Sequence, residues 1–407
     1  MSRLSDHLRR LVSEAVVQRP GDPDERSLVV FGPPGTGKTT AMRRMVLDDL
    51  MGEGVDPERM MVATFTRNAR REILQRLHKE TGLGERDWPW VRTIHSACFH
   101  LLELSQEQMV GDNHLQEFGE AYGYAFSGEE QEDGAEGYPG LPATRSYGEW
   151  ALFAEQLRRA CQLTVPEAVR AFGHRRTLAA THWSESTARR FADQYRDFKR
   201  QQRLFDFTDL LEITVEQGLS PPLTHVYIDE AQDLSHLQWT VVDQWARQAR
   251  AVVAFGDDDQ AIYSFAGADP EALLRRAGAR AVLSQSWRLP ANIHRTAEGL
   301  ISRVRARAPK VFRPDGEGGR VGRLYSWADL YPQGDERWLV LARNRVHLAG
   351  VRHHLRQRLV PFFDRTSGSG IPDPESPTGR AIATAFELQR GRLVVDRRAI
   401  RNLRSRV

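Results

Sequence analysis

The chain has 407 residues, enough to bury more than one hydrophobic core, so two or three domains are expected. Its two cysteines, Cys98 and Cys161, exclude a disulfide framework and a cysteine-based metal site. The first residues lack the apolar core of a signal peptide, and no apolar run approaches membrane-spanning length. We therefore expect a soluble, cytoplasmic protein without a membrane partner.

The net charge of +3 is unevenly distributed along the chain. Residues 301–407 contain 22 Arg or Lys and 10 Asp or Glu, a difference of +12, which leaves −9 for the first 300 residues. A basic C-terminal third is typical of a surface that binds a polyanion. An arginine-rich solvated surface explains the same excess, and the composition does not separate the two interpretations.

The first strong pattern is a phosphate loop. Residues 1–26 are expected to form a short helix and a loop, and the apolar run 28–31 is expected to form a strand. The sequence Gly32-Pro-Pro-Gly-Thr-Gly-Lys38-Thr39 follows, and a helix is predicted over 39–50. This is the G-x-x-x-x-G-K-[ST] pattern between a strand and a helix, whose backbone N–H groups surround a polyphosphate.

The residue types fit this chemistry. Lys38 is one of only four lysines in the chain, and an ammonium here would reach the β- and γ-phosphates. The hydroxyl of Thr39 would help to hold Mg²⁺. The predicted nucleotide-binding residues of the loop are Gly32, Pro33, Pro34, Gly35, Thr36, Gly37, Lys38, Thr39 and Thr40.

Strand and helix signals then alternate, as they do in a parallel α/β sheet. Strands are predicted over 60–65 and 91–95, with a helix over 68–80 between them. From 104 to 203 strand signals almost vanish. An acidic, Gly-rich loop is predicted at 127–140, and amphipathic helices are predicted around 149–161 and 185–201. We interpret this stretch as a mostly helical insertion.

Two later strands end in acidic residues. The strand predicted over 224–228 runs into Asp229 and Glu230, which suit a water-mediated Mg²⁺ ligand and a carboxylate that positions an attacking water. The strand predicted over 252–255 runs into Gly256-Asp-Asp-Asp-Gln260. Beyond it, Tyr263 and Phe265 could stack on bases, although the residues alone favour packing in the core.

These motifs, in this order, resemble the superfamily 1 DNA helicases of the UvrD/Rep/PcrA group over about residues 28–370. The stretches that carry the resemblance, besides the phosphate loop, are Ala63-Thr-Phe65-Thr-Arg67-Asn-Ala69, Thr93-Ile-His95-Ser96, Phe205-Asp-Phe-Thr-Asp209-Leu-Leu, Asp229-Glu-Ala-Gln-Asp233, Gly256-Asp-Asp-Asp-Gln260-Ala-Ile-Tyr263, Ser286-Trp287-Arg288 and Leu341-Ala-Arg343-Asn344.

The resemblance implies a RecA-like parallel-sheet P-loop NTPase core with a helical insertion and the start of a second RecA-like lobe. Residues 1–103 and 204–280 would form the first lobe, 104–203 the insertion and 281–407 part of the second lobe. It also implies ATP and Mg²⁺ as cofactors and 3′ to 5′ movement on single-stranded DNA.

Roles for single residues also follow from the resemblance. Lys38, Asp229, Glu230, Gln260 and Arg288 would be catalytic, with Thr39 and Asp229 holding the metal. Gln260 would sense the γ-phosphate, Arg288 would reach it from the second lobe, and Trp287 would stack on the adenine. The residues expected along single-stranded DNA are Phe65, Arg67, His95, Tyr263 and Phe265.

The chain also departs from the family pattern. The adenine-reading L-N-x-x-Q element is not visible around Gln18, and Phe265-Ala266-Gly-Ala stands where the family has W-R-G-A. The sequence stops at Val407, before the family's motifs V and VI. A truncated chain, a split gene whose companion chain acts in trans, and a protein that no longer unwinds DNA all remain open.

Three functions are therefore weighed. The first is an ATP-dependent helicase that acts on single-stranded DNA and on junctions of single and double strands. The second is a nucleotide-dependent single-strand-binding module with little hydrolysis unless the missing half is supplied. The third, a small-molecule kinase, explains Lys38 and Asp229 but not the aromatic motifs.

Overall fold

The computed structural model describes residues 26–126, 146–172, 183–326, 338–342, 346–357 and 362. They contain a six-stranded sheet in the order β3-β2-β4-β5-β1-β6, in which every neighbouring pair is parallel. This confirms the predicted parallel α/β class. The strands are β1 (Ser27–Phe31), β2 (Met60–Ala63), β3 (Val91–Arg92), β4 (His225–Ile228), β5 (Ala251–Gly256) and β6 (Ala279–Val282).

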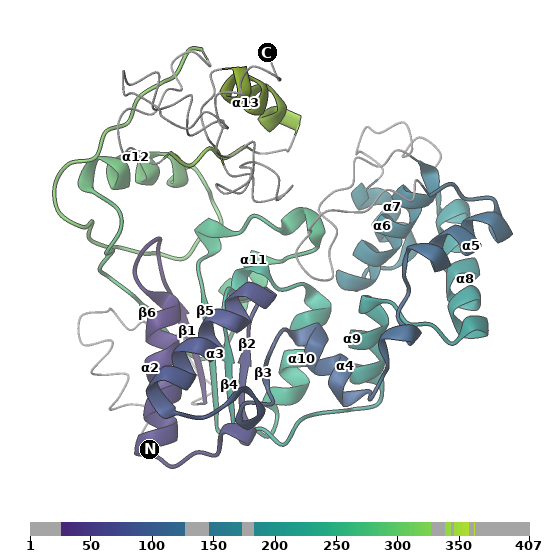
Figure 1. Ribbon diagram of the computed structural model, residues 1–407, viewed down its shortest axis with the longest axis horizontal. Coiled ribbons are helices and arrows are strands. Elements are labelled where there is room, and N and C mark those ends of the chain that lie inside the picture. Colours follow the sequence, from purple (N-terminus) through teal and green to yellow (C-terminus); the bar gives the residue numbers. More distant parts are fainter. Residues whose placement is uncertain are drawn as a thin grey trace, which may run out of the picture. The chain divides into compact units, whose positions relative to one another are not determined.

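Helices cover both faces of the sheet (Figure 1). Helices α2 (Lys38–Gly52) and α3 (Arg67–Thr81) pack on one face, where their apolar residues share a core with Leu28 and Val30 of β1. Helices α4 (Ile94–Leu101), α9 (Phe207–Glu216) and α10 (His236–Ala246) pack on the other face with Val29 and Phe31. Since successive strand residues point to opposite faces, burial on both faces explains the unbroken apolar runs in the sequence.

The parallel arrangement places the ends of β1, β4 and β5 side by side. Phe31 lies opposite Gly256, and Ile228 lies opposite Ala254. The Gly32 N–H donates to the Gly256 carbonyl at 2.9 Å, which extends the β1–β5 pairing by one residue. The loops that follow these three strands therefore meet at one edge of the sheet, where parallel α/β proteins place their ligands.

A separate group of helices lies between β3 and β4 in the sequence (Figure 1). Its aromatic core contains Phe118, Trp150, Phe191 and Tyr195, and the Phe118 and Phe191 rings meet edge to face at 5.6 Å. No strand lies among the described residues of 104–203, and α6 and α8 confirm the two helices predicted there. The helices are α5 (Asp112–Tyr122), α6 (Tyr147–Ala160), α7 (Val165–Phe172) and α8 (Glu185–Gln202).

The chain after β5 continues through α11 (Pro270–Arg275), β6 and α12 (Ala291–Ile301), and a first compact unit ends at Arg320. The second unit is Val321–Val407; its described part contains α13 (Val346–Gln357), where Val351 and Leu355 pack against Val340 and Phe362. The predicted boundary between 280 and 281 falls inside β6. The division into lobes stays a prediction.

The strand predicted over 91–95 is wrong in its second half. Strand β3 ends at Arg92, and α4 begins at Ile94. Thr93 is the reason, because its side chain accepts a hydrogen bond from the Ser96 N–H at 3.2 Å and caps the helix. His95 is therefore a helical residue.

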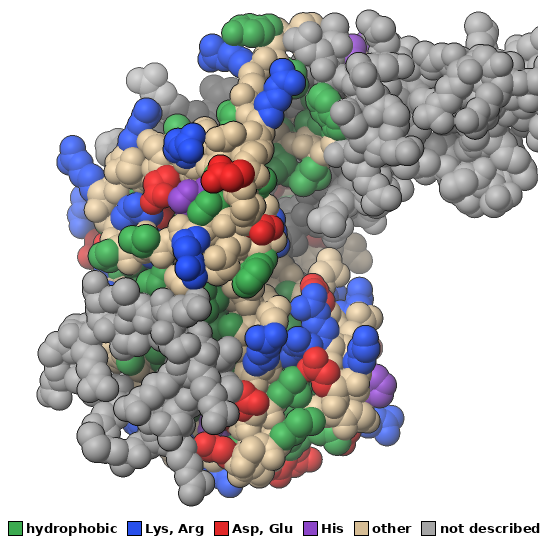
Figure 2. All heavy atoms as spheres, turned by 90° about the vertical axis from the view of Figure 1, so that its left-hand side faces the viewer, with side chains coloured by type: hydrophobic (Ala, Val, Ile, Leu, Met, Phe, Trp, Pro, Cys, Tyr) green, Lys and Arg blue, Asp and Glu red, His purple; other side chains and the backbone are tan. Residues whose placement is uncertain are grey.

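Three other predictions lie outside the described residues. They are the helix expected within 1–26, the acidic loop at 127–140 and the polar motif at Arg343 and Asn344. Of the C-terminal basic excess of +12, the described residues carry +7, with 9 Arg or Lys against 2 Asp or Glu. On the face drawn in Figure 2, Lys and Arg side chains are interspersed with acidic and apolar ones over the described residues. Among the described helices, none is long and apolar enough to cross a membrane.

A partly buried acid lies at the opposite edge of the sheet from these loops. Asp49 of α2 accepts a hydrogen bond from the Tyr227 hydroxyl, and its carboxylate lies 3.9 Å from the His225 imidazole. Burial, together with the negative charges of Glu53 and Asp48, raises the pKa of Asp49 from 3.8 to about 7. The folded protein therefore binds a proton here that the unfolded chain releases near pH 4.

This shift predicts a loss of stability as the pH rises. A folded-state pKa above the unfolded value means that the free energy of unfolding falls between about pH 4 and pH 7. The neutral side chain in Asp49→Asn should remove this component, so the variant should lose about 3 kcal/mol less than the wild type between pH 4.5 and 8. Urea denaturation at several pH values measures it, and parallel curves for both proteins would contradict the assignment.

Candidate nucleotide site and neighbouring aromatic residues

The phosphate loop joins β1 to α2, as the sequence predicts. Gly35 and Gly37 adopt φ angles of 77° and 82°, a left-handed region that favours glycine. No side chain from the described residues caps the N-terminus of α2, where Gly37 is the first flanking residue. Free helix N–H groups and the helix dipole at such an end attract anions. A Cβ on Gly32 would lie 2.0 Å from Cγ of Lys38, so the lysine requires a glycine beneath it.

The predicted cation and acids lie together at this loop. The Lys38 ammonium donates to the Gly32 carbonyl at 3.0 Å and lies 3.9 Å from the Glu230 carboxylate. The Thr39 hydroxyl donates to Oδ2 of Asp229 at 3.3 Å, across 190 positions of sequence. Asp229 is buried directly after β4, whereas the Glu230 side chain is 41% exposed. The structure thus groups a hydroxyl and two carboxylates beside one ammonium.

Burial controls the protonation of Asp229. It raises the pKa of this carboxyl to about 6, with the Glu230 charge adding to the shift and Lys38 opposing it. Asp233 behaves in the same way, since burial and Glu230 raise its pKa to about 7. A cation bound near Asp229 and Asp233 would lower these raised pKa values, because it favours the ionised form of a carboxyl.

Gln260 reaches the same loop from β5. Its side-chain amide donates to the Gly32 carbonyl at 3.4 Å and to the Asp257 carboxylate. The Asp257 backbone N–H donates to Oε1 of Gln232, whose amide in turn donates to Glu230 at 3.0 Å. Gln260 and Glu230 are therefore joined through two intermediate residues, Asp257 and Gln232.

The stretch Ser286–Arg288 lies directly against the loop. The Ser286 hydroxyl donates to the Pro34 carbonyl at 2.8 Å, and the Trp287 N–H donates to the Gly35 carbonyl at 2.9 Å. A Cβ on Gly35 would lie 2.5 Å from Cβ of Arg288. The Trp287 side chain is 72% exposed, and Arg288 is exposed as well. Both side chains are therefore available to a ligand in front of the loop.

Three of the predicted DNA-binding residues form a row of rings. Phe65 lies 4.8 Å from Tyr263, and Tyr263 lies 6.0 Å from Phe265, measured between ring centroids. All three rings are partly exposed, which a core position would not allow. The neighbouring Ile262 is 69% exposed, and Arg67 is exposed at the start of α3.

The fourth predicted aromatic position, His95, is a buried residue of α4. It is 5% exposed, and its ring meets that of Phe207 edge to face at 5.8 Å. Burial lowers the pKa of His95 to about 4, so the imidazole is neutral near pH 7. Phe207 covers it and is 42% exposed. Sequence reasoning missed Phe207, although it stands inside the quoted 205–211 motif.

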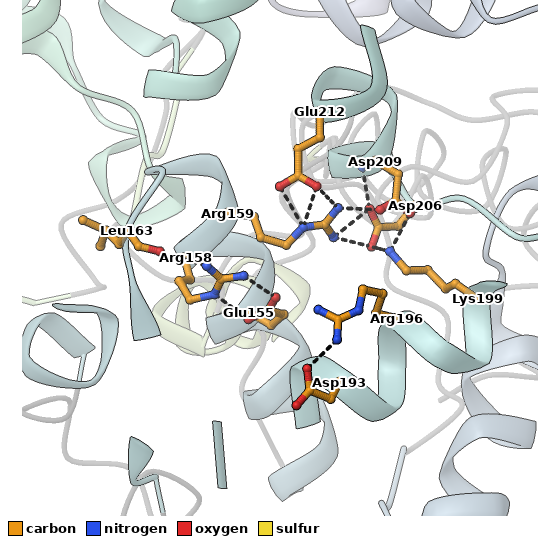
Figure 3. A network of polar contacts seen from close by, with 10 residues as sticks. All are labelled: Glu155, Arg158, Arg159, Leu163, Asp193, Arg196, Lys199, Asp206, Asp209 and Glu212. Carbon is orange, nitrogen blue, oxygen red and sulfur yellow. Dashed lines mark hydrogen bonds and ion pairs between the residues drawn. The ribbon is translucent and has the colours of Figure 1, made fainter. Parts of the chain in front are cut away.

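A buried ionic network holds the helix that carries Phe207 (Figure 3). The Arg159 guanidinium of α6 donates to Asp206, Asp209 and Glu212, and the Lys199 ammonium of α8 donates to Asp206 at 2.7 Å and Asp209 at 2.5 Å. Asp206 also caps α9 by accepting from the Asp209 N–H at 2.8 Å. The network therefore ties the helical group to α9.

The cations determine the charge of the central acid. Burial alone would raise the pKa of Asp206, but the guanidinium of Arg159 and the ammonium of Lys199 hold it well below its usual range. Asp206 and Asp209 belong to the quoted 205–211 motif and Glu212 directly follows it, but Arg159 and Lys199 carry no motif signal. Sequence reasoning had no means of pairing them.

Comparison with known proteins adds to this geometry. Residues 17–279 match the UvrD/REP helicase N-terminal domain. The chain is 24% identical over 344 residues to the ATP-dependent DNA helicase PcrA of Bacillus subtilis, and 27% identical over 350 residues to DNA helicase II of Salmonella typhimurium. Each alignment covers 80% of this chain and 44% of the relative.

A further relative is the putative ATP-dependent DNA helicase YjcD of Bacillus subtilis, 26% identical over 264 residues, which cover 61% of this chain and 32% of YjcD. The chain thus spans less than half the length of each of these relatives.

The ionic network yields a stability prediction. Lys199→Met removes the ammonium while Asp206 stays buried and Asp209 stays partly buried, so it should destabilise the fold by about 3 kcal/mol. Arg196→Met is the matched control on the same helix, because its pair with Asp193 is exposed on both sides and should contribute less than about 0.5 kcal/mol. Urea denaturation of both variants gives the comparison. Equal effects would show that burial of the network contributes nothing.

Proposed function

The chain belongs to the UvrD/REP helicase family, and we propose that it couples ATP hydrolysis to 3′ to 5′ movement along single-stranded DNA and to opening of duplex at junctions. One observation carries the proposal. The short segment 256–265 places Gln260 at the phosphate loop and Tyr263 and Phe265 in the exposed aromatic row. A change at a nucleotide phosphate could therefore reach bound DNA through a few residues of backbone.

The triphosphate would lie in front of the loop. The Lys38 ammonium now donates to the Gly32 carbonyl at 3.0 Å. It would turn from this carbonyl to the β- and γ-phosphates, because a hydrogen bond to an anion is stronger than one to a neutral carbonyl. The partly exposed Glu230 would hold the attacking water in line with the γ-phosphate. Gln260 would sense the presence of that phosphate from the opposite side.

The donor set around Thr39 fits a magnesium ion. A hydroxyl and a carboxylate lie 3.3 Å apart, and Mg²⁺ prefers oxygen ligands of this kind. When bound, the ion would neutralise charge on the phosphate oxygens. Asp229 would then be held ionised despite its burial, and Thr39 would keep its hydroxyl oriented toward the same point.

The stretch 286–288 would contact both the adenine and the γ-phosphate. The exposed Trp287 indole would stack on the base, and Arg288 would approach the γ-phosphate, because the backbone of both residues already contacts Gly35. A companion chain that supplies further motifs stays a prediction from the sequence.

Single-stranded DNA would follow the row formed by Phe65, Tyr263 and Phe265. Each base offers a π-face to an aromatic ring, so such a row binds strands with little regard to sequence. Arg67, at the end of the row near Phe65, would contact the phosphate backbone. His95 lies beneath Phe207, so it would act mainly by supporting that ring beside the strand.

Phosphate release from ATP, with and without single-stranded DNA, tests the nucleotide site. The wild type should show DNA-stimulated turnover, and Lys38→Ala should lower it by roughly 100-fold or more because the variant lacks the charge at the phosphates. Lys79→Ala, which removes an exposed lysine of α3, is the matched control and should behave like the wild type.

The outcomes separate the two functions. Turnover that persists in Lys38→Ala would place hydrolysis elsewhere. Wild-type binding of ATP and DNA without turnover would instead support the nucleotide-dependent single-strand-binding module.

The aromatic row yields a second prediction. Phe65→Ala and Phe265→Ala should each weaken binding of a fluorescently labelled poly(dT) oligonucleotide about tenfold, since stacking contributes roughly 1–3 kcal/mol per base, while ATP affinity stays within about twofold. Met51→Ala, which truncates a 64% exposed side chain at the end of α2, controls for loss of exposed apolar surface. Fluorescence anisotropy measures binding. Wild-type DNA affinity in both Phe variants would remove the row from the DNA path.

A further inference from the structure

Three consecutive acids follow β5 at the edge of the phosphate loop. The side chains of Asp257, Asp258 and Asp259 are 0%, 2% and 12% exposed. Three carboxylates so close and so dry cannot all be ionised without a cation, because burial and mutual repulsion both favour the protonated forms. We refer to these three residues as the acid triad.

Lys310 supplies that cation. Its ammonium lies 2.6 Å from Asp257, 2.5 Å from Asp258 and 2.9 Å from Asp259, and its side chain is 1% exposed. The three N–H donors of an ammonium thus each face one carboxylate. Like Lys38, it is one of the four lysines of the chain, whereas the remaining 53 basic residues are arginines. A point charge with three donors suits this site better than a planar guanidinium.

Two neighbouring groups hold the same segment in place. Arg307 makes a two-pronged contact with Asp259 at 3.0 and 2.7 Å, and the Ala308 N–H donates to Asp258 at 2.9 Å. Neither group touches Asp257. Lys310 therefore differs from Arg307 in its contact with Asp257, and an experiment can compare the two residues on that basis.

Asp257 connects the acid triad to the nucleotide site. One of its carboxylate oxygens, Oδ1, accepts from Lys310, and the other, Oδ2, accepts from the Gln260 amide. Gln260 also donates to the Gly32 carbonyl, which Lys38 contacts at 3.0 Å. Without the Lys310 ammonium, the Asp257 carboxylate would be free to turn, and Gln260 would lose the group that fixes its amide.

Lys310 also belongs to the stretch that carries Trp287 and Arg288. The Ser286 N–H donates to the Arg313 carbonyl at 2.9 Å, and the Arg313 N–H donates to the Ser284 carbonyl at 2.7 Å. The segments 284–288 and 307–313 are therefore hydrogen-bonded to each other. This unit contacts the phosphate loop at Gly35 and the acid triad at Lys310.

We propose that Lys310 is a positioning residue: by holding Asp257 it orients Gln260 toward the γ-phosphate and links movement of the 284–313 unit to the nucleotide. The inference rests on the proposed function and deepens it. Lys310 touches no nucleotide itself. Loss of Lys310 should therefore reduce the preference for triphosphate over diphosphate and lower kcat, and should change the affinity for ADP much less.

The test compares Lys310→Met with Arg307→Met. Each variant removes one cation from the acid triad and replaces it with an unbranched apolar side chain, but only Lys310→Met releases Asp257. Displacement of a fluorescent nucleotide gives the affinities for a non-hydrolysable ATP analogue and for ADP, and phosphate release gives kcat and KM for ATP.

Lys310→Met should bind ADP within threefold of the wild type, lose at least fivefold of the preference for the triphosphate, and show a kcat at least tenfold lower with little change in KM. Arg307→Met should keep the wild-type preference. Equal losses in both variants, or an unchanged preference in folded Lys310→Met, would overturn the proposal.

Two further arms keep the test decisive. If Lys310→Met does not fold, the ratio of the affinities for the ATP analogue and for ADP is measured in the triple variant that adds Asp258→Asn and Asp259→Asn. This variant removes two of the acidic charges and leaves Asp257 without its ammonium. A wild-type ratio in it overturns the proposal, and a lost preference for the triphosphate supports it. If the wild type binds the triphosphate but shows no turnover, the proposed function fails, and the triphosphate preference still decides the role of Lys310.

Discussion

The neutralisation of buried carboxylates at the edge of a parallel sheet is the constraint on which the rest of this structure depends. Parallel strands bring the ends of β1, β4 and β5 together, so the acids that follow β4 and β5 share one small volume with the phosphate loop. Such acids are stable in ionised form only beside cations or hydrogen-bond donors. Lys38 and Thr39 of the phosphate loop and the distant Lys310 supply these groups from two separate parts of the sequence.

The use of lysine follows the same constraint. The chain has 57 basic residues, four of them lysines, and three of those lysines have side chains that are at most 10% exposed and lie beside acids: Lys38, Lys199 and Lys310. Where the acids follow one another along a helix, as Asp206, Asp209 and Glu212 do at α9, the guanidinium of Arg159 contacts all three. The compact ammonium is found where several oxygens converge on one point.

Much of the fold and of the site could be predicted from the sequence. The phosphate loop, the acids after β4 and β5 and the continuous apolar strands are local patterns, and local patterns are what a sequence displays. Strand 91–95 was wrong in part because Thr93 acts as a cap, and the capping residue competes with strand propensity within the same five residues. The strand β6 carries only a short apolar signal and was not predicted.

The ionic contacts could not be predicted, since they join residues far apart in sequence. Lys310 meets Asp257 across 53 positions, and Arg159 meets Asp206 across 47. No spacing rule connects such pairs, and the raised pKa of Asp49 depends likewise on burial that only packing creates. The partial exposure of the aromatic row is a similar case, because the alternating rings at 263 and 265 suit a core strand equally well.

The central claim is that the γ-phosphate and single-stranded DNA are sensed by the two ends of segment 256–265. Coupling of this kind is reciprocal, so it can be measured from the DNA side alone. The most direct measurement is the affinity of the wild-type chain for a poly(dT) oligonucleotide in the presence of ADP, of a non-hydrolysable ATP analogue, and of neither. The account predicts that the two nucleotides give DNA affinities that differ at least fivefold. Equal affinities with both nucleotides bound at saturation would contradict it.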